Sequence, residues 1–130
     1  MRKPGGAAIL IVEDEAIVAE LYRISLERAG FRVAVAGDGV AGLSAVAADR
    51  PDLIFLDIRM PKLDGVEVLK RLRADEATQD VPVVMLSNFD EPGLVKQTLD
   101  LGAKEYLVKA GLLPADLTVI AKRWLAEVDG

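Results

Sequence analysis

Short apolar segments that alternate with helical patterns are the feature that most constrains how this chain can fold. Continuous apolar runs of strand length indicate strands that are buried on both faces of a sheet. Regular alternation of such strands with helices favours a parallel sheet that is covered by helices on both sides. The sequence therefore predicts an α/β fold in one domain, with strands at residues 8–12, 31–35, 53–56, 82–86 and 105–108.

Five segments with helical periodicity follow these strands. They are expected at residues 15–29, about 40–47, 65–73, 91–101 and 114–128. Apolar residues recur at helical spacing in the first and second segments, as Ile17, Leu21 and Ile24 and then as Val40, Leu43 and Ala47. The last segment has the clearest apolar stripe, which consists of Leu117, Ile120, Ala121, Trp124, Leu125 and Val128.

The composition removes several classes of chemistry. The 130 residues include no cysteine and no histidine, which excludes disulfides, thiolate or imidazole metal ligands, and cysteine or histidine catalysis. A net charge of −5 argues against broad contact with nucleic acid or an anionic membrane surface. The apolar runs are too short to span a membrane, and residues 1–7 are expected to be a flexible lead-in rather than a signal peptide. A cytoplasmic location is the simplest expectation.

Polar side chains follow four of the five predicted strands. Glu13 and Asp14 come after the first strand and Asp57 after the third, while Ser87 follows the fourth and Lys109 the fifth. In an open α/β sheet, ligands bind at the carboxyl ends of the strands, where the strand order reverses. The sequence therefore predicts that these five side chains share one pocket.

The residue types in this predicted pocket suit a metal ion and a phosphoryl group. Three carboxylates would repel one another, and a divalent cation with oxygen ligands, such as Mg²⁺, relieves that repulsion. The Lys109 ammonium and the Ser87 hydroxyl suit phosphoryl oxygens, and carboxylates such as that of Asp57 serve as phosphoryl acceptors. Each residue also has a plainer alternative role, with Asp14 as a helix N-cap, Ser87 as a loop residue and Lys109 as a surface lysine.

A second motif, Gly37-Asp38-Gly39-Val40-Ala41-Gly42, matches the G-x-G-x-x-G pattern of dinucleotide sites. It follows the second strand rather than the first, and the neighbouring carboxylates would repel a pyrophosphate. The expected role of this motif is therefore a glycine-eased loop and helix start.

Taken together, these motifs resemble the receiver domain of bacterial two-component response regulators. The resemblance runs from Ile9 to Trp124 and rests on four blocks, which are Val12 to Glu15, Leu56 to Gly65, Val84 to Ser87 and Gly102 to Lys109. It implies a flavodoxin-like, doubly wound fold whose five parallel strands have the order 2-1-3-4-5, with five helices.

The resemblance also implies roles for individual residues. Asp57 would accept the phosphoryl group, and Lys109 would pair with Asp57 and then with that group. Asp14, Asp57, Glu13 and the backbone carbonyl of Arg59 would hold Mg²⁺. Ser87 would move to the phosphoryl group, and Tyr106 would turn inward. Arg59 and Phe89 would flank the pocket and influence hydrolysis, and we expect Phe89 to screen the phosphoryl group from water.

The chain departs from the family where Lys109 is followed by Ala110 and Gly111 instead of proline. A cis peptide bond before a non-proline residue costs about 2.5–4 kcal/mol, so either a trans bond or a strained loop is expected. Pro92 and Gly93 fit a movable helix over residues 91–101, and equally a plain helix start.

The implied function is a phosphorylation-driven switch that is not an enzyme beyond catalysing its own phosphorylation and dephosphorylation. Its phosphodonor would be a sensor histidine kinase, a histidine phosphotransfer protein or a small phosphodonor. Its output face would be formed by the fourth helix, fifth strand and fifth helix, for a downstream protein or a homodimer. The alternatives are a non-switching interaction module and a Mg²⁺-dependent phosphatase, which would need an acid where this chain has Ile58 and Arg59.

Overall fold

The computed structural model describes residues 6–129 and consists of five strands and five helices in strict alternation. The strands are β1 Ala8–Val12, β2 Arg32–Ala36, β3 Leu53–Asp57, β4 Val83–Ser87 and β5 Glu105–Val108. The helices are α1 Ala16–Arg28, α2 Gly39–Ala48, α3 Gly65–Ala74, α4 Pro92–Asp100 and α5 Pro114–Asp129. The lead-in expected at residues 1–7 falls largely on residues 1–5, which lie outside the described residues.

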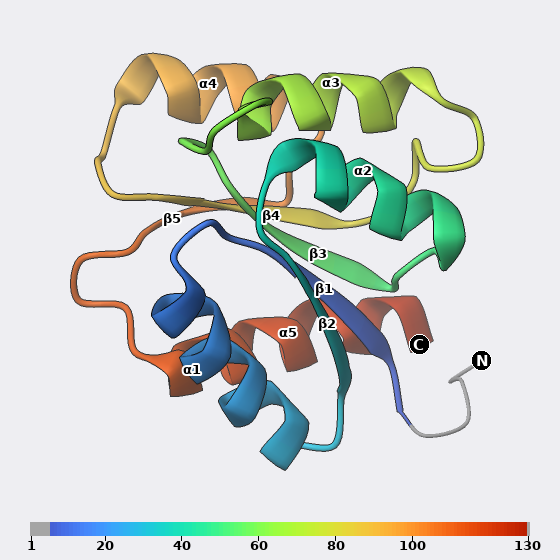
Figure 1. The fold of residues 1–130 in the computed structure, drawn as a ribbon, viewed down its shortest axis with the longest axis vertical. Helices are drawn as coiled ribbons and strands as arrows, with labels where there is room; N and C mark the ends of the chain where they lie inside the picture. The colour runs from blue at the N-terminus through green and yellow to red at the C-terminus, as the bar shows by residue number, and fades with distance from the viewer. Residues whose placement is uncertain (1–5, 130) are drawn as a thin grey trace.

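The strands form one parallel sheet with the order β2-β1-β3-β4-β5, as predicted. Helices α1 and α5 cover one face of the sheet, and α2, α3 and α4 cover the other (Figure 1). Each face has its own hydrophobic core. One core combines β1, β3 and β4 with α1 and α5, and the other combines these strands with α2 and α3. Every residue of β1, β3 and β4 is buried, which explains their apolar composition.

Helix α1 turns a different face to the core than its most apolar residues suggest. Its buried residues are Ala19, Tyr22 and Leu26. By contrast, Ile17 and Leu21 are 79% and 51% exposed. The helical spacing is therefore right, but it belongs to an apolar stripe on the surface. Helix α2 shows the effect in part, since Gly39, Gly42 and Val46 are its buried residues and Val40 is 51% exposed, while Leu43 packs partly buried against the core.

The last helix agrees with its predicted stripe as far as its side chains are described. Leu117, Ala121 and Leu125 are fully or nearly fully buried, Ile120 is 9% exposed, and Trp124 packs partly buried against the same core. The side chain of Val128 lies outside the described part of the chain. Strand β2 begins one residue later than predicted and is mostly exposed, because it lies at the edge of the sheet.

A single arginine ties three segments together at the amino end of β4. The Arg73 guanidinium donates to the carbonyls of Leu101 and Gly102 after α4, at 3.0 and 3.1 Å. It also donates to the carbonyls of Gln79 and Val81 in the segment before β4, both at 3.0 Å. Partial burial lowers the pKa of Arg73. The C-terminal end of α4 is thereby fixed to α3 and to the loop before β4.

We expect Arg73→Gln to lower the free energy of unfolding by about 2 kcal/mol, because four backbone carbonyls, two of them in partly buried contacts, lose a charged donor. Chemical denaturation measures this change. The matched control is Arg71→Gln on the same helix, whose exposed ion pair with Glu67 contributes less than about 0.5 kcal/mol. Equal effects of the two substitutions would contradict this role for Arg73.

Candidate functional site

Three carboxylates meet at the carboxyl end of the sheet. Glu13 and Asp14 follow β1, and Asp57 is the last residue of β3. One oxygen atom from each carboxylate lies within 4.8 Å of the others. Glu13 and Asp57 are buried, at 1% and 3% exposure, whereas Asp14 is exposed. The strands thus bring together the acids that the sequence placed at their ends.

Lys109 joins this cluster from the carboxyl end of β5, the strand at one edge of the sheet. Its Nζ atom lies 2.6 Å from Oε1 of Glu13 and 3.0 Å from Oδ2 of Asp57. All three side chains are largely withdrawn from solvent, at 8%, 0% and 4% exposure. The backbone positions Lys109 as well, because its N–H donates to the carbonyl of Ser87 at 2.7 Å. A surface-lysine role for Lys109 is therefore wrong.

Burial dominates the electrostatics of the cluster. It raises the pKa of Glu13 to about 7, against the lowering effect of Lys109 and with a further contribution from the Asp57 charge. Burial likewise raises the pKa of Asp57, although Lys109 opposes the shift. Burial lowers the pKa of Lys109, but its close contacts with the carboxylates of Glu13 and Asp57 outweigh this effect, and the net pKa of Lys109 is raised. One ammonium group therefore compensates two buried carboxylates incompletely.

The cluster fits a divalent cation. Oε1 of Glu13 is buried and has no hydrogen bond of good geometry, even though the Lys109 charge lies close to it. Its other oxygen accepts the N–H of Glu15 at 3.2 Å. A buried carboxylate oxygen without a well-formed hydrogen bond, beside two further carboxylates, suits Mg²⁺, which takes oxygen ligands and retains several waters. The structure therefore supports a metal-binding role for this acidic cluster.

The alternative of Asp14 as the N-cap of α1 is wrong. The N-cap residue is Glu15, and its side chain makes no capping hydrogen bond. The exposed Asp14 carboxylate instead shares the cluster with Glu13 and Asp57. At the start of the helix, the Glu13 carboxylate accepts a hydrogen bond from the N–H of Glu15.

The loop after β3 is folded tightly against the carboxyl end of that strand. The N–H of Gly65 donates to the carbonyl of Ile58 at 2.7 Å. A Cβ atom added to Gly65 would lie 2.2 Å from the carbonyl oxygen of Asp57, so no larger residue fits there. Asp64 then caps α3 by accepting the N–H of Glu67 at 3.0 Å. This packing holds the backbone of Asp57 in place.

A chain of hydrogen bonds links Ser87 to Tyr106 through the backbone of Phe89. The buried Ser87 Oγ accepts the Phe89 N–H at 3.2 Å, and the Tyr106 hydroxyl donates to the Phe89 carbonyl at 2.9 Å. The Phe89 side chain itself is 59% exposed. Ser87 is thus neither a plain loop residue nor isolated, because it holds the loop that Tyr106 also contacts.

Glu91 is a residue that sequence reasoning missed. Its carboxylate pairs with Arg59, so this pair connects the loop after β3 with the start of α4. The signal in the sequence is weak, since Glu91 reads as an ordinary acidic residue beside a helix start.

The glycine motif at residues 37–42 serves packing. A Cβ atom on Gly39 would lie 2.1 Å from the carbonyl oxygen of Leu63, and one on Gly42 would lie 3.0 Å from Val12. Asp38 caps α2 by accepting the N–H of Ala41 at 2.8 Å. The interpretation as a glycine-eased loop and helix start accounts for all of these contacts.

The turn after β5 contains no cis bond, and all peptide bonds among the described residues are trans. Gly111 takes the left-handed conformation, with φ of 80°. The N–H of Leu112 donates to the carbonyl of Lys109 at 2.9 Å. Lys109 therefore reaches the acids with a trans peptide bond after it and a glycine turn at Gly111. A trans bond was one of the two expected outcomes.

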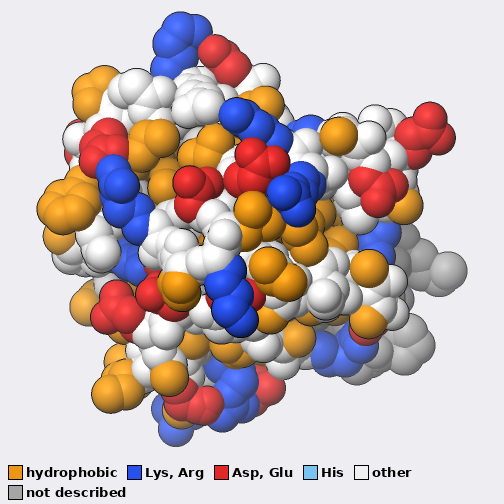
Figure 2. All heavy atoms as spheres, turned by 45° about the horizontal axis from the view of Figure 1, so that its top comes forward, with side chains coloured by type: hydrophobic (Ala, Val, Ile, Leu, Met, Phe, Trp, Pro, Cys, Tyr) orange, Lys and Arg blue, Asp and Glu red, His pale blue; other side chains and the backbone are white. Residues whose placement is uncertain are grey.

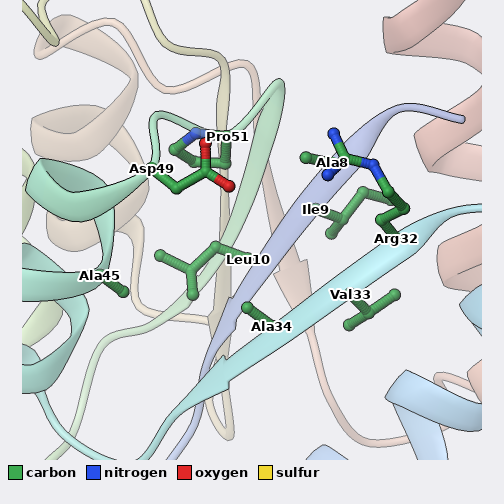
Figure 3. A pocket seen from close by; sticks show the side chains of 9 residues that line it. All are labelled: Ala8, Ile9, Leu10, Arg32, Val33, Ala34, Ala45, Asp49 and Pro51. Atoms are coloured by element: carbon green, nitrogen blue, oxygen red, sulfur yellow. The ribbon is translucent and has the colours of Figure 1, made fainter. Parts of the chain in front are cut away.

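A separate hollow of about 190 Å³ lies between α2 and the strands β1 and β2, remote from the acids (Figure 3). The hollow is left open partly because two of its lining residues, Ala34 and Ala45, have small side chains. Ala8 and Arg32 begin their strands there, so the hollow lies at the amino end of the sheet. It does not communicate with the acidic cluster through any shared lining residue.

The fold and the acid–lysine cluster define a doubly wound α/β protein with an acidic site at the carboxyl ends of its strands. The family model of the response regulator receiver domain matches residues 9–120. The chain is 44% identical over 101 residues to the DNA-binding dual master transcriptional regulator RpaA of Synechocystis. This match covers 78% of this chain and 42% of RpaA. This protein belongs to the response regulator receiver domain family.

Solved structures agree with this assignment. The Francisella response regulator 1452 receiver domain superposes with a TM-score of 0.87 at 27% identity, over 95% of this chain and 99% of that one. The phosphorylated cyanobacterial phytochrome response regulator RcpA superposes with a TM-score of 0.84 at 28% identity, over 93% and 95%. The chain thus spans less than half of a curated relative but nearly the whole of these solved receivers. No helix among the described residues is long and apolar enough to cross a membrane.

The raised pKa of Glu13 predicts a pH-dependent stability in metal-free protein. Folding favours the protonated carboxyl, so this contribution is complete below pH 4.5 and is lost as pH rises through about 7. We expect wild type to lose on the order of 3 kcal/mol relative to Glu13→Gln across that window. Urea unfolding in the presence of a chelator measures both proteins, and a pH-independent difference would contradict the assignment.

Proposed function

We propose that this protein is a phosphorylation-dependent switch in which Asp57 accepts a phosphoryl group from a histidine on a partner protein. The observation that carries the proposal is the contact of Lys109 with both Asp57 and Glu13 in a buried site. The phosphorylated state of RcpA, a solved receiver of the same fold, supports it. Mg²⁺ is the proposed metal, held by Asp14, Asp57, Glu13 and the backbone carbonyl of Arg59.

The proposed transfer is a substitution at phosphorus. An oxygen of the Asp57 carboxylate forms the new bond to phosphorus, and the bond to the donor imidazole nitrogen breaks, with the electron pair leaving on the imidazole. Mg²⁺ held by these residues would supply positive charge to the phosphoryl oxygens. Lys109 is already in place to neutralise the same oxygens, since its Nζ lies 3.0 Å from Oδ2 of Asp57.

The hydrogen bonds of the loop after β4 suggest how the switch is read out. The Ser87 hydroxyl uses only its acceptor capacity towards the Phe89 N–H, so its proton is available for a phosphoryl oxygen. If Ser87 turns towards that oxygen, the Phe89 backbone loses a partner, and the Tyr106 hydroxyl holds the same backbone. Movement at Ser87 is thereby passed to Tyr106, which lies on β5 beside α4.

The output face of the proposal comprises α4, β5 and α5. Glu105 on β5 pairs with Arg123 and accepts the indole N–H of Trp124 at 2.7 Å. Leu99 and Val119 are exposed apolar residues on the flanking helices. A downstream protein is the proposed occupant of this face, and a second copy of the chain is the alternative occupant.

The phosphodonor is proposed to dock beside the acids. The exposed stripe of Ile17, Leu21 and Ile24 on α1 starts three residues after Asp14. It suits contact with an apolar helical surface on the partner protein. A sensor histidine kinase or a histidine phosphotransfer protein meets this description. Figure 2 shows acidic and basic side chains interspersed on the displayed face, which suits protein partners better than nucleic acid. The DNA-binding character of RpaA is not proposed for these residues.

The alternative functions are less well supported by the site. A non-switching module does not require a buried lysine between two acids. A phosphatase would need a carboxylic acid directly after the acceptor, but Ile58 is buried at 3% exposure in the hydrophobic core.

The decisive experiment is incubation with Mg²⁺ and acetyl phosphate, followed by intact mass measurement. We expect wild type to gain the mass of one phosphoryl group, and Asp57→Asn or chelator treatment to abolish the gain. Asp100→Asn, which removes an exposed acid that pairs with Lys96, is the control and should leave the gain intact. A full mass gain in Asp57→Asn would refute the assignment of the acceptor.

Phe89 offers a second test of the site. Its exposed ring lies two residues after Ser87, and we expect it to shield the acyl phosphate from water. Phe89→Ala should therefore accelerate loss of the phosphoryl group by up to about tenfold. The decay of phosphorylated protein after removal of the phosphodonor measures this rate, with Leu99→Ala as an exposed apolar control. Unchanged or slower decay in Phe89→Ala would sink the idea.

A further inference from the structure

An ion pair joins the two loops that border the acidic cluster, and the proposed phosphotransfer does not use it. One terminal nitrogen of Arg59 donates to both carboxylate oxygens of Glu91, at 2.8 and 3.1 Å. Arg59 lies two residues after Asp57, and Glu91 lies four residues after Ser87. The pair therefore connects the loops that leave the ends of β3 and β4.

Glu91 holds the N-cap position of α4 but does not cap the helix. Its side chain makes no capping hydrogen bond, because its carboxylate is directed to Arg59. The first turn of α4 contains Pro92 and Gly93 and is exposed or half-buried throughout. Within α4, only Thr98, in the last turn, is buried. The start of the helix is thus held by a surface ion pair, whereas its end is fixed by Arg73.

The two ends of α4 differ in how easily their arginine contacts exchange. Arg73 is half-buried and donates to backbone carbonyls, which have no competing ligand. Arg59 and Glu91 are 61% and 37% exposed, and exposed pairs of this kind are weak. A phosphoryl group carries more negative charge than a carboxylate and offers three acceptor oxygens to a guanidinium.

We propose that Arg59 is an exchange residue, whose guanidinium leaves Glu91 for the phosphoryl group when Asp57 is phosphorylated. The exchange stabilises the phosphorylated state and frees the start of α4 in one step. Glu91 competes with the phosphoryl group for Arg59 and so holds the unphosphorylated state. This inference rests on the proposed function, because it requires a phosphoryl group on Asp57.

The test uses beryllofluoride with saturating Mg²⁺ as the phosphoryl mimic and measures its apparent Kd by calorimetry. Glu91→Gln should tighten binding, and Arg59→Gln should weaken it, each by about two- to fivefold, which is the range of one exposed ion pair. The double variant separates exchange from a general charge effect. If the exchange occurs, adding Glu91→Gln to Arg59→Gln leaves the apparent Kd unchanged, because the guanidinium for which Glu91 competes is then absent.

Two outcomes would overturn the proposal. One is an equal effect of Glu91→Gln with and without Arg59→Gln, which indicates only long-range charge. The other is an effect of the same sign, or none, in both single variants, which indicates a fixed tether or no role. The matched control is Lys96→Gln, which removes the exposed Lys96–Asp100 pair on the same helix and should leave Kd unchanged.

A second readout follows the helix directly. In beryllofluoride-free Glu91→Gln, the amide resonances of residues 93–95 should shift towards their positions in beryllofluoride-bound wild type. Shifts in another direction would contradict release of α4. The Mg²⁺ affinity of each variant, measured without fluoride, distinguishes an effect on metal binding from an effect on beryllofluoride binding. Failure of wild type to bind beryllofluoride would refute the proposed function itself, whereas normal binding with unaltered variants would refute only the exchange.

Discussion

The rest of the structure depends on the placement of one ammonium group between two buried carboxylates. Lys109 lies 2.6 Å from Glu13 and 3.0 Å from Asp57, and these residues come from the ends of three different strands. Removing charges from water is costly, so this arrangement persists only because the sheet is rigid and its central strands are fully buried. The cost is incompletely offset, as the raised pKa of both carboxyls shows. A site with excess buried negative charge is poised for a cation.

The same arrangement explains how a local chemical change at the site is able to reach a distant surface. The strand ends carry the acids and the lysine of the site, and the loops that leave these ends carry the next layer of contacts. Ser87 holds the Phe89 backbone, which Tyr106 also holds, and Arg59 holds Glu91 at the start of α4. These contacts are few, whereas Arg73 makes four hydrogen bonds to backbone carbonyls near the other end of α4. The fold therefore combines a fixed end and an exchangeable end in one helix.

Much of this was predictable because parallel strands impose their own signature. Their continuous apolar runs identify β1, β3 and β4, and the residues that follow them, Asp57 above all, must then meet at one edge. The buried face of α1 was not predictable from apolar spacing, because the core accepts Ala19 and Tyr22 while Ile17 stays on the surface. Periodicity locates a helix, but only packing decides which of its apolar faces is inside.

By itself, the sequence determined the strand–helix alternation, the acids at the strand ends and the absence of any histidine or cysteine chemistry. These properties are local, since they depend on residue type and spacing along the chain. Only the tertiary structure decided that Lys109 contacts Glu13 as well as Asp57, that Ser87 Oγ receives the Phe89 N–H, and that Arg59 pairs with Glu91. Pairs such as Lys109–Glu13 and Arg59–Glu91 join residues far apart in sequence, and their partners depend on side-chain directions that only the packed sheet and its loops define.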